Sequence, residues 1–141
     1  GDADAMIESH LINAVKSEAS GNGDTALVDQ AESYKPGNTM SPELTAAIQN
    51  EKGDLVLRAS ELLSSEDTRT KDKKSPADDL GITTARELLK AMAPTYAEAN
   101  RLYTEGYKRR NGSTTELVGG QWRVKPNVAA ARKRLKSLYP K

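Results

Sequence analysis

Cysteine is absent from this 141-residue chain, and histidine and tryptophan occur once each. The absence of cysteine excludes disulfides, thiolate metal sites and cysteine nucleophiles, and it is compatible with a reducing compartment. A metal centre built from several histidines is also excluded, because His10 stands alone. We interpret His10 as a structural residue of the first helix.

Large apolar residues are scarce as well. Hydrophobic residues make up 36% of the chain and phenylalanine is absent, whereas globular domains usually contain about 45–50% apolar residues. The core must therefore be modest and largely aliphatic, which argues against a large buried catalytic cleft. No pair of carboxylates lies in a sequence context that would raise the pKa of either one. We expect a protein that is not an enzyme, with no catalytic residue, cofactor or metal ligand to assign.

Long apolar runs are also missing. No stretch approaches the ~20 consecutive apolar residues that a membrane-spanning helix needs, and no signal-peptide pattern is present. The basic C-terminal helix could lie on an anionic membrane, but its apolar face offers only small and aliphatic side chains before Tyr139. We therefore expect a cytoplasmic, nucleoid-associated or virion-associated protein with no membrane partner.

Charge of both signs is plentiful, and it is unevenly distributed. The formal net charge is only +1, but residues 1–100 carry 10 Lys and Arg against 18 Asp and Glu. Residues 101–141 carry 11 Lys and Arg against 2 Asp and Glu. Such segregation favours a basic segment that meets a polyanion. Two alternatives remain open, since the two halves could attract each other or the basic end could simply be solvated.

The acidic part, residues 1–64, has the apolar spacing of helices. The pattern predicts one helix before the "GNG" segment, a short helix over residues 24–34, and a third that begins with Ser41 as cap and Pro42 in the first turn. Apolar residues keep one helical phase on both sides of Gly53: Leu44, Ile48, Leu55, Ala59 and Leu62. This phase fits either one kinked helix or two short ones.

A polar segment over residues 65–80 separates this region from the basic one. No apolar residue lies between Ser64 and Pro76. The composition predicts a flexible linker between an acidic helical region, residues 1–64, and a basic domain, residues 81–141. The acidic region would serve self-association or contact with a protein partner.

The basic domain has clear helix and hairpin signals. Thr84 with Glu87, and Thr95 with Glu98, form capping boxes for two helices that Pro94 separates. Gly106 is positioned to cap the second of these helices. The Gly-Gly pair at residues 119–120 predicts a β-hairpin, and a final helix is expected from Asn127.

This order of elements, with "TARELL", "EANRLYTEGYKRR" and "GGQWRV", resembles a winged helix-turn-helix DNA-binding domain of the excisionase and MerR-like branch. The resemblance covers residues 82–138. It implies a mainly α-helical fold with one β-hairpin, and duplex DNA as the partner.

The helix that begins after Thr95 would present Asn100, Arg101 and Thr104 on its outer face, where Asn can pair with adenine and Arg with guanine. The same face could equally be an ordinary solvated one. Tyr96 flanks it and could donate a hydrogen bond to a phosphate. On the hairpin, alternation predicts that Trp122 anchors the strands on the core, although it could instead stack on a single-stranded base.

Cations complete the candidate site. If the segment after the second helix were extended, only some of its side chains could touch one strand of phosphates. The candidate nucleic-acid-binding residues are Tyr96, Asn100, Arg101, Thr104, Lys108, Arg109, Arg110, Arg123, Lys125, Arg132, Lys133 and Lys136. The sequence therefore predicts a nucleic-acid-binding protein with duplex DNA as the favoured target. The alternative is a helical assembly protein, such as a virion or scaffold component, whose basic end docks an acidic protein surface.

Overall fold

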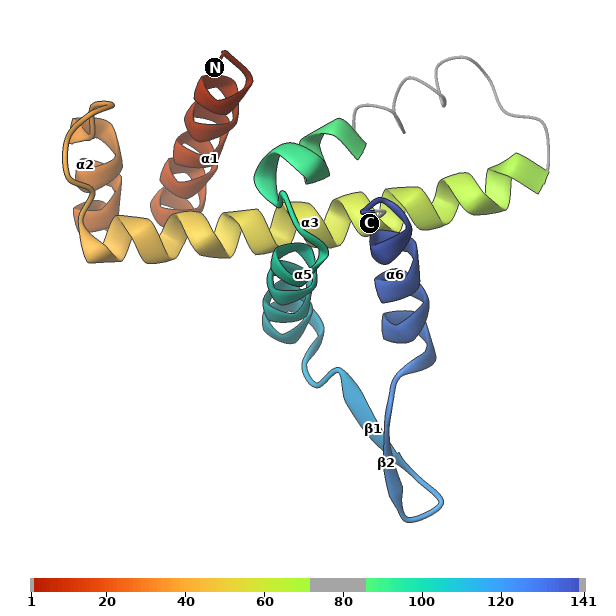
Figure 1. Ribbon diagram of the computed structural model, residues 1–141. Coiled ribbons are helices and arrows are strands. Elements are labelled where there is room, and N and C mark those ends of the chain that lie inside the picture. Colours follow the sequence, from red (N-terminus) through yellow and green to blue (C-terminus); the bar gives the residue numbers. More distant parts are fainter. Residues whose placement is uncertain (1, 72–85, 140–141) are drawn as a thin grey trace. The chain divides into compact units, whose positions relative to one another are not determined.

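A computed structural model describes residues 2–71 and 86–139 of the chain. Six helices and one two-stranded antiparallel hairpin occur in these residues (Figure 1), which confirms the expected mainly α-helical fold. None of the helices in the described ranges is long and apolar enough to cross a membrane. The chain forms two compact units, which we call unit 1, Gly1–Lys52, and unit 2, Gly53–Lys141.

Unit 1 contains two helices that pack against each other, α1 (Asp2–Gly21) and α2 (Thr25–Ser33), and the first part of α3 (Pro42–Lys71). Its buried apolar side chains are Leu11, Val15, Ala19, Ala31, Leu44 and Ile48. The turn between α1 and α2 is short because Gly23 adopts φ +76°, a conformation that glycine tolerates without strain. Asp24 then caps α2 by accepting a hydrogen bond of 3.1 Å from the backbone N–H of Leu27.

The predicted start of α3 is confirmed. The hydroxyl oxygen of Ser41 accepts a hydrogen bond of 3.1 Å from the Leu44 N–H, and Pro42 occupies the first helical position, where its missing N–H is not needed. The Ser41 hydroxyl also hydrogen-bonds the side-chain oxygen of Gln30 on α2. This bond ties the beginning of α3 to the helix before it.

α3 is one continuous helix, which decides between the two possibilities that the sequence left open. It includes residues 65–71, the first part of the predicted linker; the remaining residues of that segment, 72–80, lie outside the described residues. None of residues 65–71 is proline or glycine, the two residue types that are least favourable inside a helix. The division between the two units falls inside α3, before Gly53.

Two glycines bring helices of unit 2 into backbone contact. A Cβ on Gly106 of α5 (Tyr96–Asn111) would overlap the carbonyl oxygen of Gly53, and a Cβ on Gly53 would lie 3.1 Å from the Leu102 carbonyl oxygen. Gly106 therefore lies inside α5, and the prediction that it caps the helix is wrong. The helix continues to Asn111, and its C-cap is Gly112, which has φ +86° and donates a backbone hydrogen bond to the Lys108 carbonyl.

The crossing also changes which face of α3 is buried. After Gly53 the buried residues among those described are Asp54, Val56, Leu57, Ala59, Ser60 and Leu63. Leu62, which the apolar phase placed inside, is 43% exposed. That expectation was wrong because Leu62 lies about 180° around α3 from Gly53, whose face contacts α5.

The predicted end of the next helix and the predicted cap of the helix after it are confirmed, while the Thr84–Glu87 capping box stays a prediction. Residues 86–92 are helical and end before Pro94, while Thr84 lies outside the described residues. The hydroxyl oxygen of Thr95 accepts a hydrogen bond of 3.2 Å from the Glu98 N–H and so caps α5. The resulting helix buries Ala99, Leu102, Tyr103, Gly106 and Tyr107.

The hairpin is confirmed as predicted. Its strands β1 (Thr115–Val118) and β2 (Gln121–Val124) pair with Leu117 opposite Trp122 and Val118 opposite Gln121. The two-residue loop consists of Gly119 and Gly120, at φ +59° and +81°, as a tight hairpin turn requires. α6 (Pro126–Ser137) follows and buries Val128, Ala131 and Leu135.

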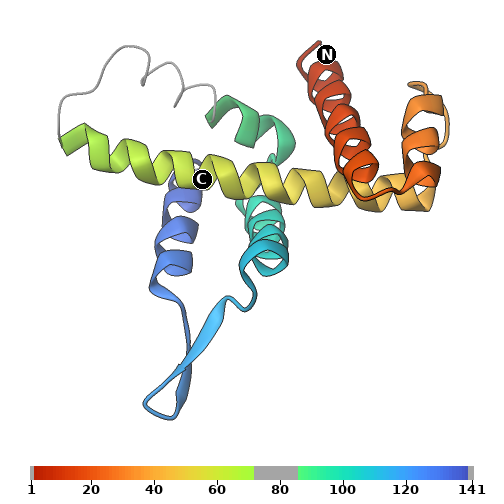
Figure 2. The ribbon, with the colours of Figure 1, turned by 180° about the vertical axis from the view of Figure 1, so that it is seen from behind.

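Trp122 does not anchor the hairpin, and that prediction was wrong: its side chain is 70% exposed. α5 and α6 pack directly against each other, so the hairpin that connects them extends beyond both helices (Figure 2). The core between these helices is formed by other apolar side chains. These include Leu102 and Tyr103 of α5 and Leu135 of α6, each at most 2% exposed.

Candidate nucleic-acid interface

The three consecutive cations that follow Tyr107 lie in the last turn of α5 rather than in an extended segment. Positive side chains are favourable there because they complement the partial negative charge of a helix C-terminus. Lys108 is exposed. Arg109 and Arg110 both bind one carboxylate, that of Asp54 on α3 within the same unit.

Asp54 is the buried partner of these arginines, with a side chain only 4% exposed. Arg109 Nη2 donates to Oδ1 at 2.6 Å, and Arg110 donates from Nη2 to Oδ2 at 2.7 Å and from Nε to Oδ1 at 3.2 Å. Burial alone would raise the pKa of Asp54. The hydrogen bonds from Arg110 and Arg109, together with their charges, outweigh that effect and hold the pKa below its usual value. The carboxylate is therefore ionised at neutral pH.

The predicted outer face of α5 is not fully open. Arg101 forms an exposed ion pair with Glu105 at 3.3 Å. The Thr104 hydroxyl accepts a hydrogen bond of 2.9 Å from Arg132 Nη2 on α6. The side-chain oxygen of Asn100 is buried and has no hydrogen-bond partner among the described residues. Of the three residues expected to read bases, only Arg101 is thus exposed, because α6 covers a flank of α5 that the sequence pattern left open.

The cations of the hairpin and its exit take different roles. Arg123 pairs with Glu116 across the strands at 3.1 Å. The Lys125 ammonium lies 5.7 Å from the ring centroid of Tyr107, a cation–π contact, and its backbone N–H binds the Thr114 carbonyl at 2.9 Å. These contacts hold the base of the hairpin against the end of α5.

The remaining candidate residues lie on α6 and at the start of α5. Arg132 is partly buried beside Thr104, whereas Lys133 and Lys136 are exposed and lie one helical turn apart. Tyr96 is half-buried at the beginning of α5. Exposed lysines are therefore contributed by both α5 and α6, while most of the arginines are engaged within the chain.

Sequence reasoning missed Asp54 as the partner of the arginine pair. It lies 55 and 56 residues before them, and no local pattern marks it. A weaker signal existed at Gly53 and Gly106, since two glycines inside helical patterns can indicate a close approach of two backbones. Had that approach been predicted, it would have placed Asp54 near the last turn of α5.

A cavity of about 230 Å³ lies in unit 2 between α3, α5 and α6. Its lining includes Ser60, Tyr103, Tyr107 and Asn127. The Ser60 hydroxyl donates at 2.8 Å to the Leu57 carbonyl of its own helix, so it is not activated by a base. Burial raises the pKa of Tyr103, and the neighbouring Tyr107 adds to this, so Tyr103 stays neutral. The cavity offers hydrogen-bonding groups and one lining carboxylate, Glu61, which is not the acceptor of the Ser60 hydroxyl.

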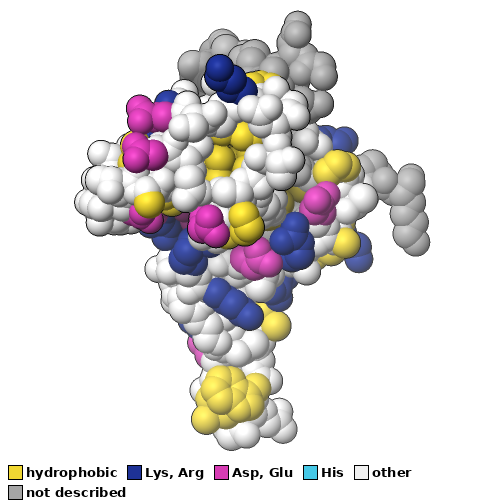
Figure 3. All heavy atoms as spheres, turned by 90° about the vertical axis from the view of Figure 1, so that its left-hand side faces the viewer, with side chains coloured by type: hydrophobic (Ala, Val, Ile, Leu, Met, Phe, Trp, Pro, Cys, Tyr) yellow, Lys and Arg dark blue, Asp and Glu magenta, His cyan; other side chains and the backbone are white. Residues whose placement is uncertain are grey.

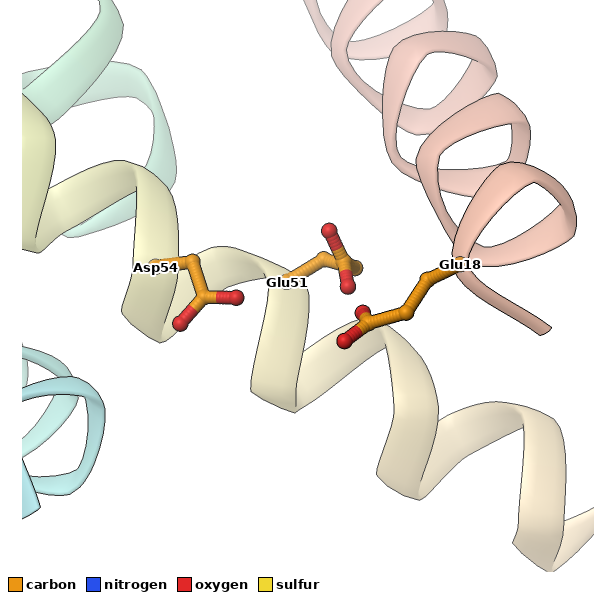
Figure 4. Close-up of side chains that lie close together, drawn as sticks. All are labelled: Glu18, Glu51 and Asp54. Atoms are coloured by element: carbon orange, nitrogen blue, oxygen red, sulfur yellow. The ribbon is translucent and has the colours of Figure 1, made fainter. Parts of the chain in front are cut away.

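Acidic side chains gather on α3, where Glu51 and Asp54 lie about one turn apart and are both buried (Figure 4). Within unit 1, a carboxylate oxygen of Glu18 on α1 lies within 4.8 Å of one of Glu51. Asp54 is already bound by two arginines. We therefore assign this group no ligand.

The chain has no match among protein-family models, curated proteins or solved structures.

Proposed function

We propose that this chain is a non-enzymatic protein whose unit 2 binds nucleic acid, with duplex DNA as the favoured target. The observation that carries the proposal is the division of charge between the two units. Residues 1–52 contain 3 Lys and Arg against 9 Asp and Glu, a net charge of −6. Residues 53–141 contain 18 against 11, a net charge of +7. A basic unit of this kind attracts a polyanion over a long range.

The exposed lysines Lys108, Lys133 and Lys136 would supply the phosphate contacts. Each contact releases counterions from the nucleic acid, so affinity should fall steeply as salt rises. Arg101 and Arg123 could join them, because exposed ion pairs are weak and can exchange a carboxylate for a phosphate. This set positions a backbone and reads little sequence, since the side-chain oxygen of Asn100, which a two-bond contact with adenine needs, is buried.

The order of helix 86–92, α5, hairpin and α6 supports a winged helix-turn-helix arrangement for the binding unit. In that proposal α5 is the helix closest to the duplex and the hairpin is the wing. Unit 1, with its acidic surface, would contact a protein partner or a second copy of the chain rather than the nucleic acid.

The test measures binding of the full chain to a short fluorescent DNA duplex by anisotropy over a series of salt concentrations. Lys133→Glu/Lys136→Glu should weaken binding by about tenfold or more at low salt. It should also reduce the slope of log K against log salt by about 2, because each lost phosphate contact contributes about 0.9. The control is Lys16→Glu/Lys35→Glu in unit 1, which changes the net charge equally. An equal loss in both variants, or no complex of the unmodified chain at low salt, would contradict the proposal.

A second candidate, an assembly protein such as a virion or scaffold component, is favoured by the Arg109–Asp54–Arg110 cluster. Two cations of the basic end already bind a buried carboxylate in this cluster, so the same end could dock an acidic protein surface. Sedimentation equilibrium over a range of protein and salt concentrations tests this candidate. Self-association that weakens with salt would support it, and a monomer under all conditions would count against assembly through its own copies.

A further inference from the structure

One face of the hairpin carries an apolar surface that the described residues leave uncovered. Strand pairing places Leu117 opposite Trp122 and Thr115 opposite Val124, so these four side chains share a face. Leu117 is 57% exposed, Trp122 70% and Val124 40%. We call Leu117, Trp122 and Val124 the hairpin face; hydrophobic side chains gather on the hairpin in Figure 3.

Isolated exposed apolar residues need no explanation, but three together on a two-stranded hairpin do. The chain contains a single tryptophan, and it stands at the most exposed position of the hairpin face. An indole ring offers a flat aromatic surface on which another planar group can stack.

The charge of the segment that contains the hairpin indicates which kind of planar group could stack on Trp122. Residues 107–125 contain five Lys and Arg against one carboxylate, Glu116, and Arg123 binds that carboxylate on the opposite face. Two of these cations, Arg109 and Arg110, also bind Asp54, and Lys125 lies over the Tyr107 ring. The segment nevertheless carries an excess of positive charge. An exposed aromatic surface in such a basic segment suits a base attached to a phosphate backbone, because the ring can stack on the base while cations attract the phosphates. It suits an acidic peptide less well, because a peptide need not supply a planar group.

We propose that Trp122, supported by Leu117 and Val124, stacks on an unpaired base of the nucleic acid that unit 2 binds. The inference rests on the proposed function and narrows its target to a nucleic acid with a single-stranded stretch, such as a gapped or overhanging duplex. In an intact duplex the faces of the bases are covered by their neighbours, and unstacking a base costs a few kcal/mol. The hairpin face therefore gains most where a base is already unpaired.

The arrangement of the hairpin argues against insertion into a membrane. The end of the hairpin consists of Gly119 and Gly120, which have no apolar side chain to enter a bilayer. The apolar residues lie along one side of the strands instead, and Gln121 adjoins the turn. A side surface of this kind can lie along an extended chain of bases.

The uniqueness of Trp122 makes the test direct, because all tryptophan fluorescence of the protein comes from this residue. Three labelled DNA molecules of matched phosphate number are compared: a blunt duplex, a duplex with a short single-stranded gap and a single strand. Anisotropy of the label measures binding, and tryptophan emission measures stacking. We expect quenching by the gapped duplex and the single strand, and little by the blunt duplex.

Variants separate stacking from charge. Trp122→Ala should weaken binding to the gapped duplex by about 5- to 150-fold, which corresponds to the loss of one stacked base. It should affect the blunt duplex little. Trp122→Phe should recover part of the loss, because it keeps a ring. The control is Val118→Ala on the opposite face of the hairpin, which is 44% exposed and should leave all three affinities unchanged. Far-UV circular dichroism checks that each variant is folded.

The outcomes are distinguishable. Binding to all three DNA molecules without a change in tryptophan emission would overturn the stacking and leave the proposed function standing. Absence of any anisotropy change would overturn both. Stronger quenching or shifting of emission by vesicles of phosphatidylserine and phosphatidylcholine would assign the hairpin face to a membrane instead. An emission shift that depends on protein concentration, with dimers in sedimentation, would assign it to a second copy of the chain.

Discussion

The two units differ in how they use their charges. In unit 1 most acidic side chains are exposed, and the helices are stabilised by a small aliphatic core. In unit 2 two arginines bind the buried Asp54, and helices α3 and α5 touch through their glycine backbones. Unit 2 has a net charge of +7, but two of its arginines are bound to a carboxylate of the same unit.

The difference teaches that the net charge of a segment does not tell which of its cations are exposed and not bound to a carboxylate of the same chain. The arginines at the end of α5 look, in the sequence, like the strongest anion-binding group of the chain. In the structure their charge is partly neutralised by Asp54, and exposed lysines on α5 and α6 remain as the better candidates for phosphate contacts.

Among the variants that test this difference between the units, Gly106→Ala should change the free energy of unfolding most. A methyl group there overlaps the Gly53 carbonyl, and neither backbone can yield without separating two helices. Alanine normally stabilises a helix interior by about 1 kcal/mol relative to glycine. We expect the clash to dominate and the free energy of unfolding to fall by about 2–3 kcal/mol, measured by urea denaturation.

The matched control is Gly21→Ala, at the end of α1 in unit 1. No atom lies within 4 Å of the added methyl group, so this variant should be neutral or slightly stabilising. If Gly106→Ala were as stable as Gly21→Ala, the close crossing of α3 and α5 would be disproved.

An intermediate effect is expected from Asp54→Asn, which removes the charge that binds Arg109 and Arg110. We expect a loss of about 1–3 kcal/mol at neutral pH, moderated because both arginines are partly exposed. The folded pKa of Asp54 is lowered, so its contribution is complete above the unfolded pKa of about 3.9 and is lost as the pH falls through the lower folded value. The stability difference between the two proteins should therefore shrink below about pH 4.

Asp29→Asn, a change of the same charge at an exposed position of unit 1, serves as the control for this experiment. It should alter stability by less than about 0.5 kcal/mol. A difference between Asp54→Asn and the unmodified protein that stayed constant down to pH 2 would show that the ion pairs do not stabilise unit 2.

The smallest effects should come from the two helix caps, Asp24 in unit 1 and Thr95 in unit 2. Replacing either with alanine removes one hydrogen bond to a helix N-terminus and should cost about 1 kcal/mol. Amide hydrogen exchange measured by NMR should accelerate at Leu27 in the first variant and at Glu98 in the second. Faster exchange throughout both units in either variant would show that the two units unfold together.

The parts that were predictable depend on short-range rules. The cap of α3 at Ser41, the end of a helix before Pro94 and the hairpin turn at residues 119–120 each follow from the properties of a few adjacent residues. The errors concern partners far away in the sequence. Gly106, Leu62 and Trp122 were all assigned from local patterns, and each has a position decided by another helix.

The amino-acid sequence by itself determined the helices, the hairpin and the concentration of positive charge near the C-terminus, because propensity, capping and charge act within a few residues. Only the tertiary structure decided which of these charges stay exposed. That outcome depends on the approach of Gly53 to Gly106, which places Asp54 against two arginines 55 and 56 residues away, and on the direct packing of α5 against α6, which leaves Trp122 in solvent.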